Sequence, residues 1–281
     1  MEANGYEIGA KANLENAEIV DENLFLANLA EAVLRGADLN MSNLTGANLY
    51  LADCSKANLS LTELEMANFG SATLVETDLT SAEVSFANFS KANLLNAILI
   101  KTLGENANMS NTNLSGAVFS DCVLHSCNFS GSDMKIAEGI RVGLMFNNFT
   151  GAVLTGSKFP KGNFAYSNFS DVDFASCDFS GAVLSGANFT RARGEGSNLS
   201  GADLTFAIFV ETNLNGVSFV KSDLSNSNFC DASLVGADFT GVNLEDANFC
   251  NANLLNANLV GVNIESAIWT GATMPDGTLH D

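Results

Sequence analysis

Basic residues, prolines and histidines are scarce in this chain. Its 281 residues include 12 Lys and Arg against 32 Asp and Glu, which gives a formal net charge of −20. Proteins that bind nucleic acid carry the opposite excess, so we expect no direct contact with nucleic acid. The two histidines, His125 and His280, are far apart in sequence and match neither a metal-binding spacing nor a catalytic triad.

Long apolar runs and recognisable leader or cofactor motifs are also missing. No run of eighteen apolar residues is present, which argues against a membrane-spanning helix. The first residues, MEANGYEIGAK, do not read as a signal peptide. We therefore expect a cytoplasmic protein, with a processed periplasmic or lumenal form left open. No phosphate-binding loop, GxGxxG or calcium-binding repeat occurs, so we predict no enzymatic activity, no cofactor and no metal site.

The sequence has instead a strict period of five. From Ala12 to Leu279 a small residue recurs at positions ending in 2 or 7, Asn or Asp usually follows, and Leu or Phe comes next, as in Ala12-Asn13-Leu14. About 54 pentads follow one another without an insertion or deletion. Because side chains alternate along an extended chain, the small residue and the Leu or Phe point to the same interior.

This A(D/N)LXX pattern resembles the pentapeptide-repeat family over nearly the whole chain. The resemblance implies an all-β fold, a right-handed quadrilateral parallel β-helix with four pentads per coil. Parallel strands also favour right-handed crossovers in general. The tail TMPDGTLHD is similar to the ends of some cyanobacterial members.

A second period of twenty supports four pentads per coil. Phe recurs at central positions such as 189, 209, 229 and 249, with Trp269 next, and Asn precedes most of them. Identical side chains would then stack on successive coils, about 4.8 Å apart. We predict that the Asn side chains bond their neighbours and the local turns.

The pattern predicts one solenoid of about 13 coils. We expect an N-terminal cap at residues 1–11, a single β-helix over 12–279, a Phe column closed by Trp269, and a tail at 280–281. The weakest segment, Lys135 to Phe146, could divide the solenoid into two stacks. Three central positions are glycine, namely Gly104, Gly139 and Gly194, and they predict local bulges that either shape a binding surface or are tolerated irregularities.

Pairing residues twenty apart gives the candidate surface features. Cation–carboxylate ladders are predicted for Arg191 with Asp171 and Glu211, Arg193 with Asp173, and Lys158 with Glu138 and Asp178. In other columns an acidic residue stacks on another acidic residue. Either these pairs bind a basic partner, or their repulsion is screened by salt and costs little stability. The pairs are Glu18/Asp38, Glu63/Glu83, Asp203/Asp223, Glu211/Asp231 and Glu245/Glu265.

One outward column is rich in large apolar residues and interrupted by Gly, Asn or Ser. It is a candidate contact surface, although scattered apolar residues are also normal on proteins. Its members are Leu26, Met66, Phe86, Phe146, Tyr166 and Phe206.

The six cysteines divide into two groups. Cys54, Cys122, Cys127 and Cys177 fall on inward positions, where they act as small apolar residues. Cys230 and Cys250 point outward on adjacent coils at a separation that permits a disulfide. Reduced thiols are the default in a cytoplasmic protein, so a bond between them stays open.

Two functions remain. The favoured one is a non-catalytic protein-interaction scaffold with an unknown protein partner, as a monomer or as an end-to-end or lateral dimer. The alternative, implied by the family resemblance, is an acidic mimic of DNA that binds a type II topoisomerase such as gyrase. Duplex DNA as long as the predicted solenoid would carry roughly 36 charges. The net charge of this chain is only −20, which argues against the mimic.

Overall fold

The computed structural model describes residues 1–281 and contains two compact units, Met1–Gly143 and Leu144–Asp281. The boundary between them falls within residues 135–146, the weakest part of the repeat pattern. A single uninterrupted solenoid over residues 12–279 stays a prediction.

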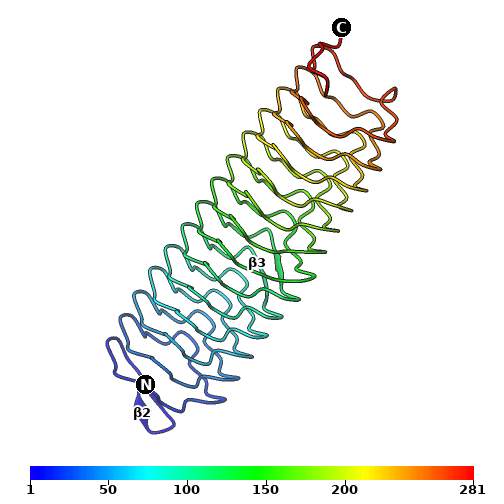
Figure 1. Ribbon diagram of the computed structural model, residues 1–281. Helices are drawn as coiled ribbons and strands as arrows, with labels where there is room; N and C mark the ends of the chain where they lie inside the picture. The colour runs from blue at the N-terminus through cyan, green and yellow to red at the C-terminus, as the bar shows by residue number, and fades with distance from the viewer. The chain divides into compact units, whose positions relative to one another are not determined.

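In each unit the chain winds into coils that stack in register (Figure 1). Parallel bridges join residues twenty apart, such as Asn68 with Asn88 in the first unit and Asn228 with Asn248 in the second. The amide of Phe69 donates to the carbonyl of Asn88 at 2.7 Å. Four pentads per coil, as the sequence predicts, are therefore confirmed within both units.

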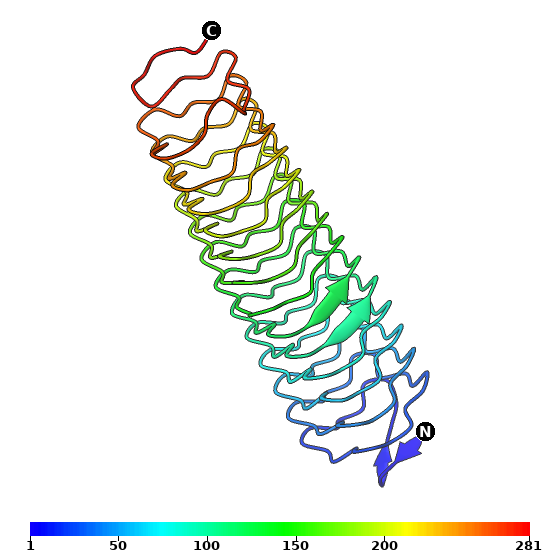
Figure 2. The same cartoon turned by 90° about the vertical axis from the view of Figure 1, so that its right-hand side faces the viewer.

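The only strands longer than one bridged residue lie in the first unit. β1 (Glu2–Ala3) pairs antiparallel with β2 (Tyr6–Glu7). β3 (Leu103–Glu105) pairs parallel with β4 (Val123–His125), and Figure 2 shows the two arrows side by side. Elsewhere a turn follows every side of a coil, so each side is reduced to a single bridge.

Each corner of a coil is a tight turn with one residue in the left-handed region. At the corner 84–87 the amide of Ala87 donates to the carbonyl of Val84 at 3.0 Å, and Phe86 has a φ of 59°. A positive φ at the third residue is the signature of a type II turn, a position that normally favours Gly or Asn. The corners therefore place an outward side chain in a strained backbone conformation.

Leu, Phe and the small residues fill the interior, as predicted. Phe209 and Phe229 are fully buried and stack with ring centroids 4.7 Å apart at an interplanar angle of 9°. Phe229 stacks on Phe249 at 4.8 Å, and Trp269 closes this column at 4.5 Å from Phe249. The predicted role of Trp269 is confirmed.

Where the small inward residue is Ser or Thr, its hydroxyl bonds a backbone carbonyl. Ser42 Oγ donates to the carbonyl of Ile19 at 2.6 Å, and Thr77 Oγ1 donates to that of Cys54 at 2.7 Å. No buried side-chain nitrogen or oxygen lacks a partner. The core therefore accepts small polar residues without an unsatisfied group.

The Asn column forms the predicted ladder. Asn68 Nδ2 donates to Asn48 Oδ1 at 3.2 Å, and Asn88 Nδ2 donates to Asn68 Oδ1 at 2.9 Å. Asn68 Oδ1 also accepts from the amide of Gly70 at 3.1 Å. From Asn28 to Asn108 these Asn side chains thus hold both a neighbouring coil and their own corner, whereas Asn188, Asn228 and Asn248 in the second unit bond only their own corners.

The first coil is covered by the hairpin of β1 and β2, in the region predicted as an N-terminal cap. Ala3 and Ile8 are buried there, and Asn4 Nδ2 donates to the carbonyl of Glu18 at 2.6 Å. Backbone groups on the edge of a β-structure need such cover, because otherwise they invite pairing with another chain.

The second unit ends in another hairpin. The chain reverses after Pro275, Thr273 bridges Leu279 in antiparallel fashion, and Met274 N donates to the carbonyl of Thr278 at 2.8 Å. Leu279 is consequently 72% exposed, although the frame of five places it in the core. His280, predicted as tail, belongs to this hairpin, because its amide donates to the carbonyl of Ala272.

The frame also fails at residues 262–266. In the regular register the amide of Asp246 would donate to the carbonyl of Glu265. It donates instead to the carbonyl of Ser266, at 2.8 Å. Ile264, predicted in the core, is exposed, and its carbonyl accepts the indole N–H of Trp269 at 2.7 Å. The large indole ends the Phe column and uses this carbonyl as its partner.

We expect the core column to carry far more stability than the corners of the same coil. Phe209→Ala should lower the free energy of unfolding by about 3–5 kcal/mol, because it opens a cavity among stacked rings. Phe206→Ala, three residues away and exposed, should change it by no more than about 0.5 kcal/mol. Guanidinium unfolding followed by circular dichroism measures both, and equal losses would contradict the assigned core.

Candidate functional site

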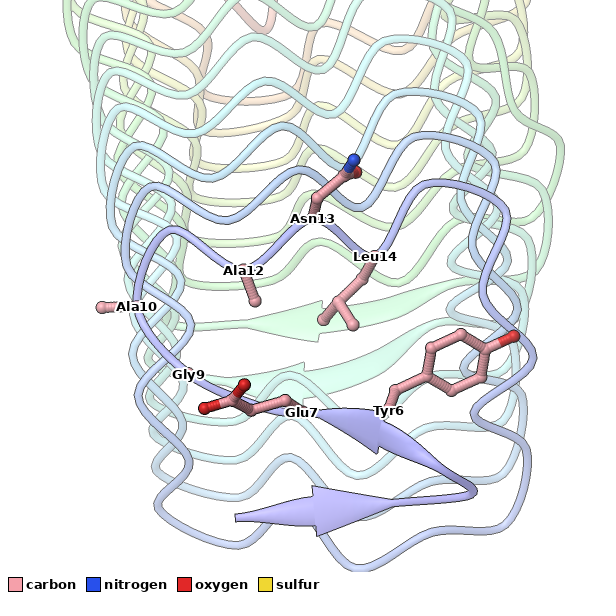
Figure 3. Close-up of a pocket in the computed structure, with 7 residues that line it drawn as sticks. All are labelled: Tyr6, Glu7, Gly9, Ala10, Ala12, Asn13 and Leu14. Atoms are coloured by element: carbon pink, nitrogen blue, oxygen red, sulfur yellow. The ribbon is translucent and has the colours of Figure 1, made fainter.

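A cavity of about 340 Å³ lies in the first unit between the N-terminal hairpin and the first coil (Figure 3). Leu14 and Ala12 point toward it from the coil, while Tyr6 and Glu7 come from β2. Glu7 supplies the only carboxylate of the lining. An isolated carboxylate without a second acid or base offers no arrangement for proton transfer chemistry.

The apolar column is the most unusual surface feature in both units. Its six side chains are between 54% and 64% exposed. Each also occupies the left-handed corner position, with φ between 56° and 59°. The first unit contributes Leu26, Met66 and Phe86, and the second contributes Phe146, Tyr166 and Phe206.

These residues are unfavourable for the isolated protein in two ways. A non-glycine residue in the left-handed region costs about 1–2 kcal/mol, and bulky residues have no local hydrogen bond to offset it. Because these side chains are exposed, they do not stabilise the fold through burial of apolar surface. Asn, which tolerates this conformation, stands at equivalent corners such as Asn16, Asn96 and Asn111.

The glycine gaps of the column are covered by neighbouring side chains. A Cβ added to Gly46 would lie 2.6 Å from Leu26 Cδ2, so Leu26 extends over it. In the second unit the ring of Tyr166 covers Gly186 in the same way, and it stacks on Phe146 with centroids 5.5 Å apart. The sequence predicts interruptions at Gly46 and Gly186, and the structure corrects this because each small residue accepts the side chain of the coil before it.

The predicted acidic stacks have different outcomes. Glu63 bridges Glu83 and Asp203 bridges Asp223, so both pairs lie on adjacent coils as expected. The amide of Glu211 donates to the carbonyl of Cys230, which brings Asp231 to the neighbouring coil.

The prediction for Glu245 and Glu265 is wrong in its register. The bond from Asp246 to Ser266 shifts the last coil by one residue at this corner. Glu245 keeps its regular contact with the preceding coil, through the amide of Asn226, but does not stand directly opposite Glu265.

Some of the stacked acids also bond the backbone of their own corner, as Asp203 and Asp223 do. Asp203 Oδ1 accepts from the amide and the hydroxyl of Thr205, at 3.1 and 2.8 Å. Asp223 Oδ1 accepts from the amide of Ser225 and from Asn243 Nδ2. These carboxylates have a structural reason to be present.

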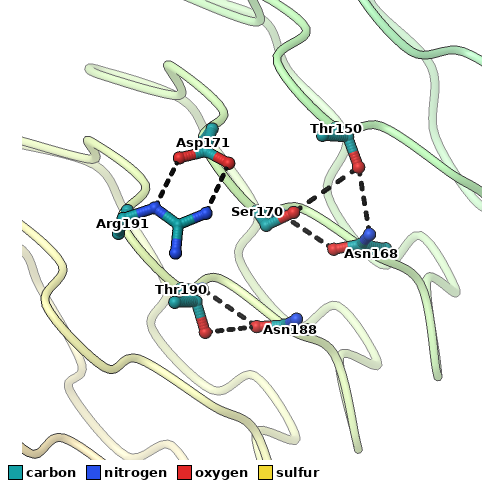
Figure 4. Close-up of polar contacts among 7 residues, drawn as sticks. All are labelled: Thr150, Asn168, Ser170, Asp171, Asn188, Thr190 and Arg191. Atoms are coloured by element: carbon teal, nitrogen blue, oxygen red, sulfur yellow. Dashed lines mark hydrogen bonds and ion pairs between the residues drawn. The ribbon is translucent and has the colours of Figure 1, made fainter.

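Two of the predicted cation–carboxylate pairs form in the second unit, Arg191 with Asp171 and Arg193 with Asp173. Arg191 donates two hydrogen bonds of 2.8 Å to the carboxylate of Asp171 (Figure 4). These bonds lower the pKa of Asp171 and raise that of Arg191, to which Glu211 also contributes by its charge. Arg193 bonds Asp173 at 2.5 Å.

Lys158 lies opposite Asp178 in the register. This agrees with the predicted column. Its proposed pairing with Glu138 stays a prediction.

Neutral groups form a second ladder beside the Arg191 pair. In Figure 4 Thr150 Oγ1 accepts from Asn168 Nδ2 at 3.0 Å, and Thr190 donates to Asn188 Oδ1 at 2.7 Å. The amide of Ser170 donates to Asn168 Oδ1 at 3.0 Å. Among the residues drawn, the two charged ones, Arg191 and Asp171, are paired with each other.

The repeat pattern matches a known protein family over most of the chain. The profile described as Pentapeptide repeats matches eight copies over residues 27–65, 62–96, 105–135, 167–205, 197–234 and 232–271. The chain belongs to the pentapeptide-repeat family. Members of this family fold as β-helices, in agreement with the stacked coils.

Several solved pentapeptide-repeat proteins are similar to this member. HetL from the cyanobacterium Nostoc sp. strain PCC 7120, involved in regulating heterocyst differentiation, is 25% identical, with 96% of this chain and 92% of HetL covered and a TM-score of 0.24. A protein of the Arabidopsis thaliana thylakoid lumen is 32% identical over 34% of this chain and 70% of its own, with a TM-score of 0.28.

A third solved structure is a trypsin-treated variant of QnrB1, a plasmid-mediated fluoroquinolone resistance protein. It is 19% identical, with 83% of this chain and 91% of QnrB1 covered and a TM-score of 0.29. A search of curated proteins gives no match. No helix of this pentapeptide-repeat protein is both long and apolar enough to cross a membrane.

The three glycines at central positions of this pentapeptide-repeat protein do not cause bulges. Gly104 lies in β3 directly opposite Leu124 of β4, with one residue for one residue. A Cβ at Gly194 would lie 2.1 Å from the ring of Phe174, so that ring occupies the missing side-chain volume. At Gly139 the space is taken by Val142 and Phe119. The predicted bulges are wrong, because neighbouring side chains compensate for each glycine.

The cysteines separate as predicted by their positions. Burial raises the pKa of Cys54 and Cys122 strongly and that of Cys177 to about 11. Cys230 and Cys250 are free thiols at a half-buried corner. Burial raises the pKa of Cys230, and the neighbouring Cys250 adds to the effect. The disulfide that the sequence leaves open is therefore not formed in this structure.

We expect thiol reagents to distinguish these two groups. Cys230 and Cys250 should react in the native protein, and the buried cysteines should react only after unfolding. Because the pKa of Cys230 is raised, its thiolate fraction at pH 8 is below that of an ordinary thiol, and its alkylation rate should keep rising above pH 9. Alkylation of Cys250→Ser followed by mass spectrometry measures this rate, and a plateau below pH 8 would contradict it.

Proposed function

We propose that this protein is a non-catalytic scaffold that binds another protein through its apolar column. The observation that carries the proposal is the column itself, in which six large apolar side chains are exposed at strained corners. Residues held in an unfavourable conformation without a local benefit point to a functional use of the strain. Burial of these side chains in a complex would supply the missing benefit.

The same arrangement supports the absence of catalysis. The cavity holds one carboxylate, and the cores of both units are filled by Leu and Phe. We further infer that the coils are right-handed and four-sided, about 13 in number, since parallel crossovers favour that hand. We assign the protein to the cytoplasm as a monomer or a dimer.

The alternative is mimicry of DNA toward a type II topoisomerase. A net charge of −20 and the stack of Asp203 on Asp223 favour it. Against it, these two carboxylates bond their own corners, and the Asn ladder is uncharged. We expect micromolar protein neither to inhibit gyrase supercoiling nor to protect gyrase from quinolones, and either effect would favour the mimic.

Replacement of corner aromatics by Asn should separate binding from folding. Phe86→Asn and Phe206→Asn place a residue that tolerates positive φ at each corner, so the free energy of unfolding should stay the same or rise by up to about 1 kcal/mol. Affinity capture from the source cells should retain at least tenfold less of any protein that the wild type binds specifically. Thermal unfolding and quantitative mass spectrometry give the two measurements.

Leu51→Asn is the matched control, because Leu51 is also exposed at a corner, with a φ of 59°, but belongs to another column. It should leave capture unchanged. The scaffold proposal fails if both Phe variants bind the same proteins as the wild type.

A further inference from the structure

One side of the first unit collects most of its exposed apolar residues. This side, here called the acidic–apolar face, comprises residues 20–26, 40–46, 60–66, 80–86, 100–106 and 120–126, which the register places side by side. Its exposed apolar side chains are Val20, Phe25, Leu26, Met41, Leu61, Met66, Phe86, Leu103 and Val123. Elsewhere in the unit only Met1, Tyr50, Leu51, Ile136 and Ile140 are comparable.

Acidic residues lie between these apolar side chains. Glu63 bridges Glu83, and Glu83 bridges Leu103, so two carboxylates and an exposed Leu follow one another along the middle of the face. Glu65 and Glu105 stand at the corner beside the apolar column, and Lys101 is the only base in these three coils of the face. Like charges directly opposite destabilise a sheet, and a cation placed between them relieves this cost.

The carboxylate of Glu83 is fixed beside Phe86. Its Oε1 accepts from the amide of Ser85 at 3.0 Å and from the hydroxyl of Ser85 at 2.5 Å. Ser85 Oγ in turn accepts from the amide of Glu105 at 3.0 Å. Phe86 is the next residue, 54% exposed at its corner. The Glu83 carboxylate is thus held, before any partner binds, at the turn from which Phe86 is exposed.

We propose that the acidic–apolar face binds a positively charged segment of a partner protein that also carries apolar side chains. This deepens the proposed scaffold function and rests on it. The ammonium or guanidinium groups would lie at Glu63 and Glu83, while their aliphatic stems and the apolar side chains would cover Met66 and Phe86. The ring of Phe86 adds a cation–π contact.

Charge decides between the occupants of this apolar surface. A second copy of the chain, with a net charge of −20, would bring acids against acids. Nucleic acid and anionic lipid surfaces are repelled for the same reason. A basic segment complements both features of the face, so electrostatic steering and apolar burial act together.

A designed peptide tests this chemistry with the full-length protein. The probe is a fluorescein-labelled 12-residue peptide of alternating Lys and Leu, compared with one of alternating Lys and Ser and one of alternating Glu and Leu. Fluorescence anisotropy should show binding of the Lys/Leu peptide at least tenfold tighter than of either other peptide. Equal affinity for the Lys/Ser peptide would overturn the apolar half of the proposal.

Matched variants locate the peptide on the protein. Glu83→Gln should weaken Lys/Leu binding about tenfold and Phe86→Asn about fivefold. Asp78→Asn removes a charge from another side of the same coils, and Leu51→Asn changes another corner, so each should alter the affinity less than twofold. The proposal is overturned if these controls weaken binding as much as the variants of the face.

Failure of this inference can be told from failure of the scaffold function. One outcome refutes only the basic partner: the Glu83→Gln variant still binds both the captured cellular protein and the Lys/Leu peptide, while the Phe86→Asn variant releases the captured protein. In that case the apolar column remains the interface. If both Phe86→Asn and Phe206→Asn retain the captured protein, the scaffold function itself is refuted.

Discussion

Backbone hydrogen bonds between residues about twenty apart are the constraint on which the rest of this structure depends. Each side of a coil donates one backbone hydrogen bond to the coil after it and one to the coil before it. The amide of Phe69, for example, donates to the next coil, and the amide of Asn88 donates to the previous one. This register allows no insertion, because a single added residue would move every later side chain to the wrong side of the chain. It therefore explains the strict period of five in the sequence, which is interrupted by a one-residue slip near Ile264 before regular pairing resumes at Ile268.

The register also explains the composition of the interior and of the ladders. Positions that repeat every twenty residues stack at the spacing of strands, so rings meet face to face and Asn amides meet end to end. Both kinds of contact are most favourable when identical residues stack on each other. Charged residues have the opposite preference, and Arg191 on Asp171 satisfies it. Where Glu63 stands on Glu83 the chain keeps an unfavourable pair, and this pair lies in the middle of the acidic–apolar face.

The corners are where this protein can carry function. Every coil needs a residue with positive φ at each corner, and Gly or Asn meets this need at least cost. Phe86, Tyr166 and Phe206 meet it at a higher cost, and their rings remain exposed. A scaffold with a filled core and closed ends presents its variable chemistry at such positions, since changes there leave the hydrogen-bonded register intact.

The sequence by itself determined the coil length, the inward residues, the Asn ladder and the role of Trp269, because a fixed register converts periodicity directly into neighbours. It also placed the apolar column and the acid stacks, although as separate features. Only the tertiary structure showed that Leu26 and Tyr166 cover glycine gaps, that the ring of Phe174 fills the space at Gly194, and that both ends are hairpins. These depend on side-chain volume and on chain reversal, which a repeat pattern does not encode. The fixing of Glu83 beside Phe86 likewise depends on the rotamers of one turn, and periodicity says nothing about them.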